Sequence, residues 1–233
     1  MKRSNAVISI VALILVLPTI GCSSGLTEAE LAYEEGSVSL EGRLYSEAIP
    51  NLDMAIQLGP DFANAYNDRG YAYSVLGENE QAIEDFNKAI ELDPDYAKAY
   101  GNRGLAYSRL GRYQLAIQDY DKAINLGLDD AKVYINSGFA YYSLGQNQRA
   151  IEDYDRGIQL EPDHALAYSN RAIAYANLDQ YKRSIEDLDR AIQLDPDFAM
   201  AYYNRGVAYR LLGRGSEADV DERQACSLES KYC

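Results

Sequence analysis

The sequence has little of the chemistry on which most enzymes depend. Histidine occurs once, as His164, which excludes a histidine-based catalytic triad and disfavours a metal site. His164 stands beside Asp163 where a helix is expected to begin, so we interpret it as a solvated turn residue. No glycine-rich loop of the phosphate-cradling kind is present. The sequence therefore predicts a protein that is not an enzyme and holds neither cofactor nor metal.

Basic residues are scarce too. Lys and Arg number 22 against 36 Asp and Glu, which gives a formal net charge of −14. The basic residues are also scattered, whereas nucleic acids bind to a basic stripe or patch. We expect no nucleic-acid partner. The hydrophobic content of 47% and the 21 tyrosines indicate a folded chain rather than a disordered one.

Long hydrophobic runs are absent except for residues 6–17, which only Ser9 interrupts. That run is shorter than the ~20 apolar residues of a membrane-spanning helix. Lys2 and Arg3 precede it and Pro18 ends it, which is the layout of an export signal. We therefore expect residues 1–21 to be a signal peptide outside the fold.

The junction that follows resembles the processing site of a bacterial lipoprotein, in which the cysteine, here Cys22, is lipidated and becomes the mature N-terminus. Two positions depart from that pattern, because Thr19 and Ile20 stand where a leucine and a small residue are usual. Ordinary signal cleavage and an uncleaved anchor therefore stay open as alternatives. Lipidation would hold the protein at a membrane of the cell envelope through the short linker 22–26.

The other two cysteines, Cys226 and Cys233, lie near the end of the chain. In an exported protein they are able to pair, and the eight-residue loop would contribute about 2.5 kcal/mol by chain-entropy arithmetic. The alternative is that Cys226 is a small core residue and Cys233 is free.

A 34-residue unit recurs from about residue 27 onward, and several residue types hold its register. Proline, tyrosine, glycine and isoleucine each recur at this period, as in Pro60, Pro94, Pro162, Pro196; Tyr66, Tyr100, Tyr134, Tyr168, Tyr202; Gly70, Gly104, Gly138, Gly206; and Ile56, Ile90, Ile124, Ile158, Ile192. A repeat of this length predicts a stacked array whose core is a seam between neighbours.

Each unit predicts two helices. In residues 61–94, Tyr66, Gly70 and Tyr73 fall on one face of a first helix, and Gly77 follows where that helix should end. A second apolar face, which includes Phe86, runs on to the break at Pro94. The small residues at the contact positions let the two helices approach closely.

These residues resemble the tetratricopeptide repeat family. The resemblance covers 27–230 as six units, namely 27–60, 61–94, 95–128, 129–162, 163–196 and 197–230. It implies an all-α, right-handed α-solenoid of helix–turn–helix pairs, with a concave groove that binds a peptide or another protein. The units depart from the pattern at Leu128, Ala172 and Asp179, and the last unit becomes polar after Gly213, as a terminal cap requires.

The groove is expected on the other face of the first helices. Its candidate residues are apolar, basic or amide side chains that have no obvious core role: Asn67, Tyr71, Lys98, Asn102, Leu105, Lys132, Asn136, Phe139, Tyr142, Asn170, Ile173, Tyr203 and Asn204. An apolar and aromatic floor indicates a partner helix or an extended peptide. The alternative for any one of them is packing against a neighbouring helix.

The asparagines at the 34-residue period occupy the place where chaperone-binding relatives hold a peptide backbone or a terminal carboxylate. Lys98 and Lys132 match the lysine position of those relatives, but asparagine stands where they have arginine. The resemblance therefore implies backbone hydrogen bonding rather than a complete carboxylate clamp.

One carboxylate pair recurs in the second helices, as in Glu84–Asp85, Glu152–Asp153 and Glu186–Asp187. Catalytic carboxylates need individual environments, so the repetition favours solvated faces. The sequence as a whole predicts a non-enzymatic scaffold that binds proteins at a membrane. A self-associating structural protein of the cell envelope is the alternative.

Overall fold

The computed structural model describes residues 26–233, and within that range it contains helices and no strand. The expected signal peptide, Cys22 and the linker up to residue 25 lie outside the described residues. Twelve α-helices and a short 3₁₀ helix follow one another along the chain.

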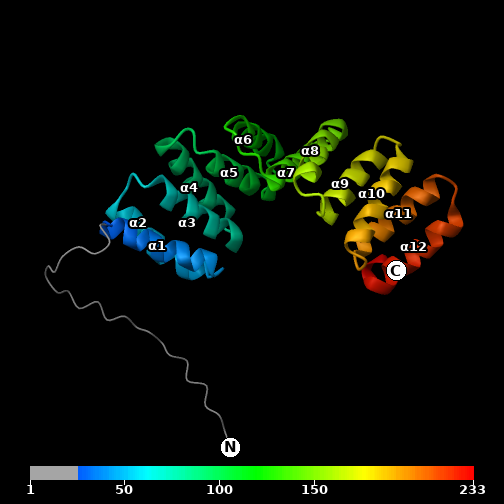
Figure 1. The fold of residues 1–233 in the computed structure, drawn as a ribbon, viewed down its shortest axis with the longest axis horizontal. Helices are drawn as coiled ribbons and strands as arrows, with labels where there is room; N and C mark the ends of the chain where they lie inside the picture. Colours follow the sequence, from blue (N-terminus) through cyan, green and yellow to red (C-terminus); the bar gives the residue numbers. More distant parts are fainter. Residues whose placement is uncertain (1–25) are drawn as a thin grey trace, which may run out of the picture.

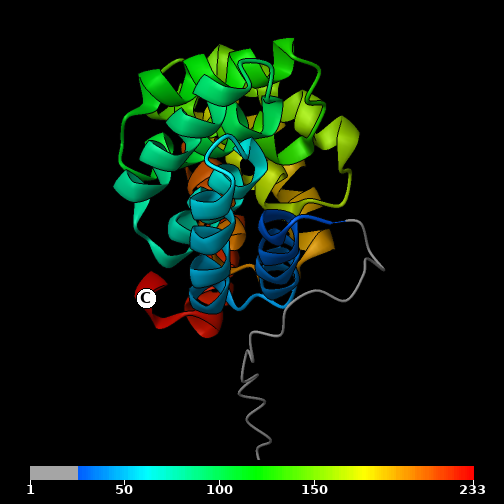
Figure 2. The ribbon, with the colours of Figure 1, turned by 90° about the vertical axis from the view of Figure 1, so that its left-hand side faces the viewer.

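The helices form six consecutive antiparallel pairs, in which each helix contacts the next in sequence. Figure 1 shows the pairs side by side in an arc, and Figure 2 shows the same array end on. The pairs are α1 (Glu28–Glu41) with α2 (Tyr45–Leu58), α3 (Ala63–Leu76) with α4 (Asn79–Leu92), α5 (Ala97–Arg109) with α6 (Tyr113–Asn125), α7 (Ala131–Ser143) with α8 (Asn147–Leu160), α9 (Ala165–Ala176) with α10 (Tyr181–Leu194), and α11 (Ala199–Leu211) with α12 (Gly215–Leu228), followed by η1 (Ser230–Tyr232).

This arrangement confirms the expected all-α solenoid. Each of the six units expected from the sequence contains one helix pair. In the middle of the arc the first helices α3, α5 and α7 lie toward the concave side, and α4, α6 and α8 lie toward the convex side (Figure 1).

The turn inside each pair depends on a left-handed residue. Gly77 ends α3 at φ 90°, a conformation that glycine adopts without a steric penalty. Asp179 holds the same place in the fifth pair at φ 57°, and it also accepts a hydrogen bond from the hydroxyl of Tyr181 at 2.5 Å. Aspartate tolerates this region better than most residues, so the pair turns without glycine.

Close approach within a pair depends on the glycine of the first helix. A Cβ at Gly104 would lie 2.8 Å from Cε1 of Tyr120, whose ring is fully buried, so an alanine there would collide with the ring. In the fifth pair Ala172 replaces the glycine, and Leu188 stands where the second, third and fourth pairs have a ring. Leu188 is smaller than a ring and so leaves space for the methyl group of Ala172, and both residues are fully buried.

Arginine–aspartate contacts join neighbouring pairs. Arg69 on α3 donates to both carboxylate oxygens of Asp85 on α4, at 2.8 and 2.6 Å, and its third nitrogen donates to Asp53 on α2 at 2.6 Å. We call the recurring set the arginine ladder; its other members are Arg103 with Asp119 and Asn87, Arg171 with Asp187 and Asp155, and Arg205 with Asp221 and Asp189.

The ladder corrects the expectation that both members of the recurring carboxylate pairs are solvated. Glu84 is exposed, but Asp85 is only 6% exposed, and the same division separates Glu186 from Asp187. Burial raises the pKa of Asp85, and the hydrogen bonds and positive charge of Arg69 oppose that rise. The arginine therefore lets a buried carboxylate stay charged between two helices.

We expect the Arg103→Ala substitution to lower the free energy of unfolding by about 3 kcal/mol, because it leaves the buried carboxylate of Asp119 without its cation. Denaturant unfolding measures this change. The matched control is Arg156→Ala, which removes an equally direct ion pair with Asp129 whose two side chains are both about half exposed. The control should leave the unfolding midpoint nearly unchanged, and equal losses in the two variants would contradict the buried role of the ladder.

Candidate functional site

A column of exposed apolar side chains runs along the first helices at the 34-residue period. Its five members are each exposed or half-buried, although they sit on helices whose opposite faces are fully buried: Tyr71, Leu105, Phe139, Ile173 and Val207. Because the first helices in the middle of the arc lie on its concave side (Figure 1), the column forms an apolar floor there. We call this surface the concave groove.

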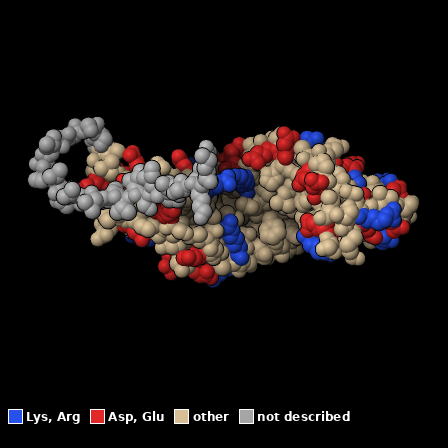
Figure 3. Space-filling view, turned by 90° about the horizontal axis from the view of Figure 1, so that it is seen from below, with Lys and Arg blue, Asp and Glu red and all other residues tan. Residues whose placement is uncertain are grey.

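The middle of the concave groove contains a cavity of about 330 Å³ between α3, α5 and α7. Figure 3 views this underside and shows a tan surface near the middle with basic side chains beside it. The cavity brings together six of the thirteen residues expected from the sequence, together with Arg109, Val75 and four others; the six are Tyr71, Lys98, Asn102, Leu105, Lys132 and Asn136.

The charge of this cavity is opposite to that of the whole chain. Within residues 26–233, Lys98 and Lys132 form no ion pair, and both side chains are exposed. Arg109 donates to the carbonyl and the hydroxyl of Ser74, so its charge stays uncompensated. Asp130 is the one acid in the cavity lining, and its carboxylate caps α7 through the amide of Lys132 at 2.7 Å. The cavity therefore attracts anionic groups.

Asn67 differs from the other residues expected in the groove. It is only 4% exposed, and its side chain accepts a hydrogen bond from Asn102 and donates one to Asp68, both at 3.0 Å. Asp68 also accepts from the hydroxyl of Tyr33 at 2.8 Å. The four side chains connect α1, α3 and α5, so Asn67 supports the groove wall and offers little of itself to a ligand.

Asp68 is absent from the residues expected in the groove. It holds the position of Asn102 one unit earlier, but the expected residues at that position were asparagines alone. Burial raises the pKa of its carboxyl group, and the hydrogen bonds from Tyr33 and Asn67 oppose that rise. The sequence did hold a signal for this residue, because Asp68 is an acid at the repeat position where the later units have asparagine.

The rest of the predicted residues lie farther along the groove. Phe139 is 40% exposed, with its ring centroid 6.0 Å from Tyr113 and 6.5 Å from Tyr142. Asn170 and Ile173 on α9 are half-buried. The amide nitrogen of Asn204 is buried and has no hydrogen-bond partner among the described residues.

The end of the chain folds against the last unit. Tyr232 in η1 stacks on Tyr203 of α11, with ring centroids 5.0 Å apart. A disulfide joins Cys226 on α12 to Cys233 and holds this tail in place. Tyr203, expected to contact a partner, contacts the chain's own tail but is still 39% exposed, so a ligand at the last unit would meet the tail there.

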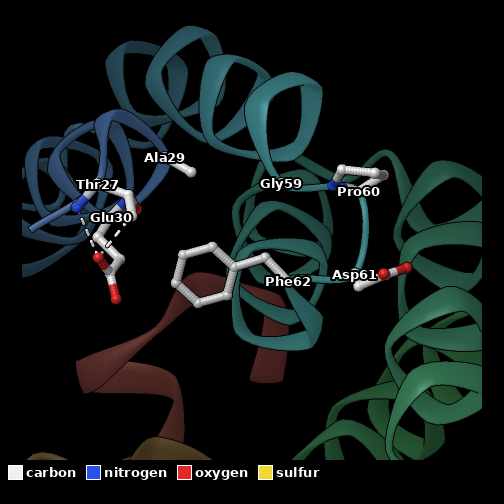
Figure 4. Close-up of a pocket in the computed structure, with 7 residues that line it drawn as sticks. All are labelled: Thr27, Ala29, Glu30, Gly59, Pro60, Asp61 and Phe62. Carbon is white, nitrogen blue, oxygen red and sulfur yellow. Dashed lines mark hydrogen bonds between the residues drawn. The ribbon is translucent and has the colours of Figure 1, made fainter.

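Another cavity of about 330 Å³ lies at the opposite end, and Figure 4 shows its lining. There the hydroxyl of Thr27 accepts from the amide of Glu30 at 3.2 Å, and the Glu30 carboxylate accepts from the amide of Thr27 at 2.7 Å. This reciprocal capping satisfies the start of α1. Phe62 across the cavity contacts Tyr33, with ring centroids 4.6 Å apart. The cavity is a seam between the first two units and brings no reactive groups together.

Two further features bear on the chemistry of residues 26–233. Their His, Cys, Asp and Glu side chains form no group of three that could hold a metal ion. Their helices are also too short or too polar to cross a membrane.

Models of repeat families match two stretches of the chain. A TPR repeat model matches residues 75–111, and tetratricopeptide repeat models match 97–126, 138–202 and 188–218. The chain is a tetratricopeptide repeat protein. The matched segments cover most of the array between α4 and α12. No curated protein is similar enough to the chain to count as a relative.

Solved tetratricopeptide repeat structures resemble this array. YrrB, described as a TPR protein with an unusual peptide-binding site, is 24% identical with a TM-score of 0.69, over 77% of this chain and 92% of that one. A MamA structure is 27% identical with a TM-score of 0.67, over 72% and 92%. PilW, described as a widely conserved type IV pilus biogenesis factor, is 20% identical with a TM-score of 0.76, over 88% and 94%.

Two asparagines of this repeat array should respond differently to substitution. Asn67→Ala should lower the free energy of unfolding by about 1–2 kcal/mol, because it removes two part-buried hydrogen bonds, one to Asp68 and one that joins α3 to α5. Asn136→Ala, at a half-buried groove position, should change it by less than about 0.5 kcal/mol. Thermal or denaturant unfolding measures both. A larger loss for Asn136→Ala would mean that this side chain supports the fold and does not serve the groove.

Proposed function

We propose that this tetratricopeptide repeat protein is a non-enzymatic scaffold that binds a peptide segment of a partner protein in the concave groove. The segment carries apolar side chains and at least one acidic group. The supporting observation is the central cavity, in which an apolar floor lies beside Lys98, Lys132 and Arg109 in a chain of net charge −14.

The shape of the groove favours an elongated ligand. Apolar side chains recur once per unit, so a segment lying along the array meets Tyr71, Leu105 and Phe139 in turn. The half-buried amides of Asn102 and Asn136 stand beside them and are able to bond a peptide backbone. YrrB, which has a similar fold and is described as having a peptide-binding site, supports this use of the array.

The proposal includes a place in the cell. The basic start, the apolar run and Cys22 favour export and lipid anchoring, after which the array would stand at a membrane of the cell envelope. Partner proteins would then be gathered at that surface.

Charge reversal in the cavity tests the binding site. A set of fluorescent peptides that differ in net charge at constant apolar content should show preferential binding of the acidic members. Lys98→Glu combined with Lys132→Glu should weaken that binding at least tenfold, about 1.4 kcal/mol, and salt should weaken it in the unmodified protein. Fluorescence anisotropy measures both effects.

The matched control is Lys182→Glu, an exposed lysine on α10 outside the cavity, which should leave affinity unchanged. Replacing both Asn136 and Phe139 by alanine should also weaken binding. Affinity that is independent of peptide charge, or unchanged in these variants, would contradict the proposed site. Size measurement by light scattering separates peptide binding from self-association of the groove.

Substitution of the lipidation candidate tests the location. Cys22→Ser should move the protein from the membrane fraction to the soluble fraction in a bacterial host. Mass spectrometry of the wild-type protein should find acyl chains on Cys22. Cys226→Ser should stay in the membrane fraction. A wild-type protein found in the soluble fraction, or a mature N-terminus at another residue, would contradict the lipid anchor and leave the groove proposal untouched.

A further inference from the structure

The arginine ladder has one interruption, at the fourth unit. Ser137 on α7 stands in the phase of Arg69, Arg103, Arg171 and Arg205. Both acidic positions that Arg171 uses are kept: Asp153 on α8 corresponds to Asp187, and Asp121 on α6 corresponds to Asp155. The fourth unit therefore has the acceptors of a guanidinium group without the arginine.

Two polar atoms at this position lack a hydrogen-bond partner of normal geometry within residues 26–233, although the Ser137 hydroxyl lies close enough to the Asp153 carboxylate to lower its pKa. Ser137 is fully buried, and its hydroxyl forms no hydrogen bond within the described residues. One carboxylate oxygen of Asp153 is also buried without a partner. In the fifth unit the corresponding carboxylate accepts two hydrogen bonds from Arg171, at 2.8 and 2.6 Å. A buried acceptor left without a donor is costly, so the position favours a ligand that donates.

The fourth unit also keeps the two tyrosines that flank each arginine of the ladder. The guanidinium carbon of Arg103 lies 5.4 Å from the ring centre of Tyr100 and 5.9 Å from that of Tyr107. Tyr134 and Tyr141 hold these two positions in the fourth unit. Arg156 approaches Tyr134 at 5.9 Å in the way that Lys122 approaches Tyr100 at 5.8 Å beside Arg103. Because Lys122 and Arg103 are both present in the third unit, Arg156 does not take the place of the missing ladder arginine in the fourth.

The charges that face this position are mainly negative. Burial, the charge of Asp121 and the charge of Glu152 raise the pKa of Asp153 to about 6, against an opposing effect of Ser137 and Arg149. Burial also raises the pKa of Asp121 on α6 and of Tyr141 on α7, and Arg149 opposes both rises. Arg149 on α8 is exposed and forms no ion pair with either aspartate.

The two carboxylates of this position have access to solvent, since Asp121 is exposed and Asp153 is half-buried, whereas Ser137 is fully buried. In the four complete rungs the arginine side chain is still 16–20% exposed, although it fills the space. Asp121 is exposed, and α6 and α8 lie on the convex side of the arc in Figure 1. A side chain could enter there without meeting the concave groove.

We propose that Asp121, Asp153 and Ser137 form a receptor for the guanidinium group of an arginine side chain of a partner protein, on the opposite surface from the groove. A guanidinium fits better than an ammonium because its planar fork can donate to one carboxylate with two nitrogens and to a second carboxylate with the third. The rungs of Arg69, Arg171 and Arg205 show that geometry. This site does not depend on the proposed peptide groove.

The test follows the carboxyl carbons of ¹³C-labelled aspartates by NMR during titration with methylguanidinium. The Asp153 and Asp121 signals should shift with saturation, at a concentration at least tenfold below that needed with methylammonium. Asp187, whose partner Arg171 is already present, should not shift. The response should weaken as the pH falls through about 6, because a protonated Asp153 cannot pair with a cation.

Two variants complete the test. Ser137→Arg should fill the position from within, raise the thermal midpoint and abolish the shift at Asp153. Asp153→Asn should abolish the shift at Asp121 while circular dichroism shows a folded array, which keeps the test valid if Ser137→Arg does not fold. A response equal for methylammonium, or retained in Asp153→Asn, would overturn the proposal. So would a response that appears only after Arg149→Gln, because Arg149 would then fill the position itself.

Discussion

Close contact between helices through residues with little or no side chain is the constraint on which this array depends. Alanines at the contact positions, such as Ala82, Ala106, Ala140 and Ala174, are fully buried. In the second, third and fourth pairs they leave room for one ring each, and Phe86, Tyr120 and Tyr154 fill it against a glycine. The apolar seam is therefore narrow and continuous, which explains why a pair is not expected to be stable without a neighbour.

The polar groups have different roles on the two surfaces of the array. On the outer side, the arginine ladder holds second helices together with buried, charge-assisted hydrogen bonds, and its geometry recurs almost unchanged from unit to unit. On the inner side the residues vary between units, from Lys98 and Lys132 in the middle to Leu166 later. The regular surface fixes the spacing of the units, and the variable one is free to select a ligand.

The sequence was sufficient for the fold because several residue types repeat in one register. The period located the helix pairs, and Gly77 and Pro94 marked where helices end. It was less informative about polar side chains, because the same repetition that suggested solvated carboxylates also arises when each carboxylate meets a repeated partner. Arg69 and Asp85 are 16 residues apart on different helices, so helical periodicity alone could not join them. The contacts of Asn67 and Tyr203 could not be inferred for a related reason, since they come from another unit or from the tail.

The stacked tyrosines at the end of the chain affect how copies could assemble. Head-to-tail growth into a filament needs two complementary open ends on every molecule. At the first unit, Leu31 and Val38 remain exposed on α1, 43% and 66%. At the last unit, the disulfide-held tail stacks Tyr232 on Tyr203, while Val220 of α12 stays 56% exposed. The two ends are therefore unequal, because a copy that docked at the last unit would contact the tail as well as α12.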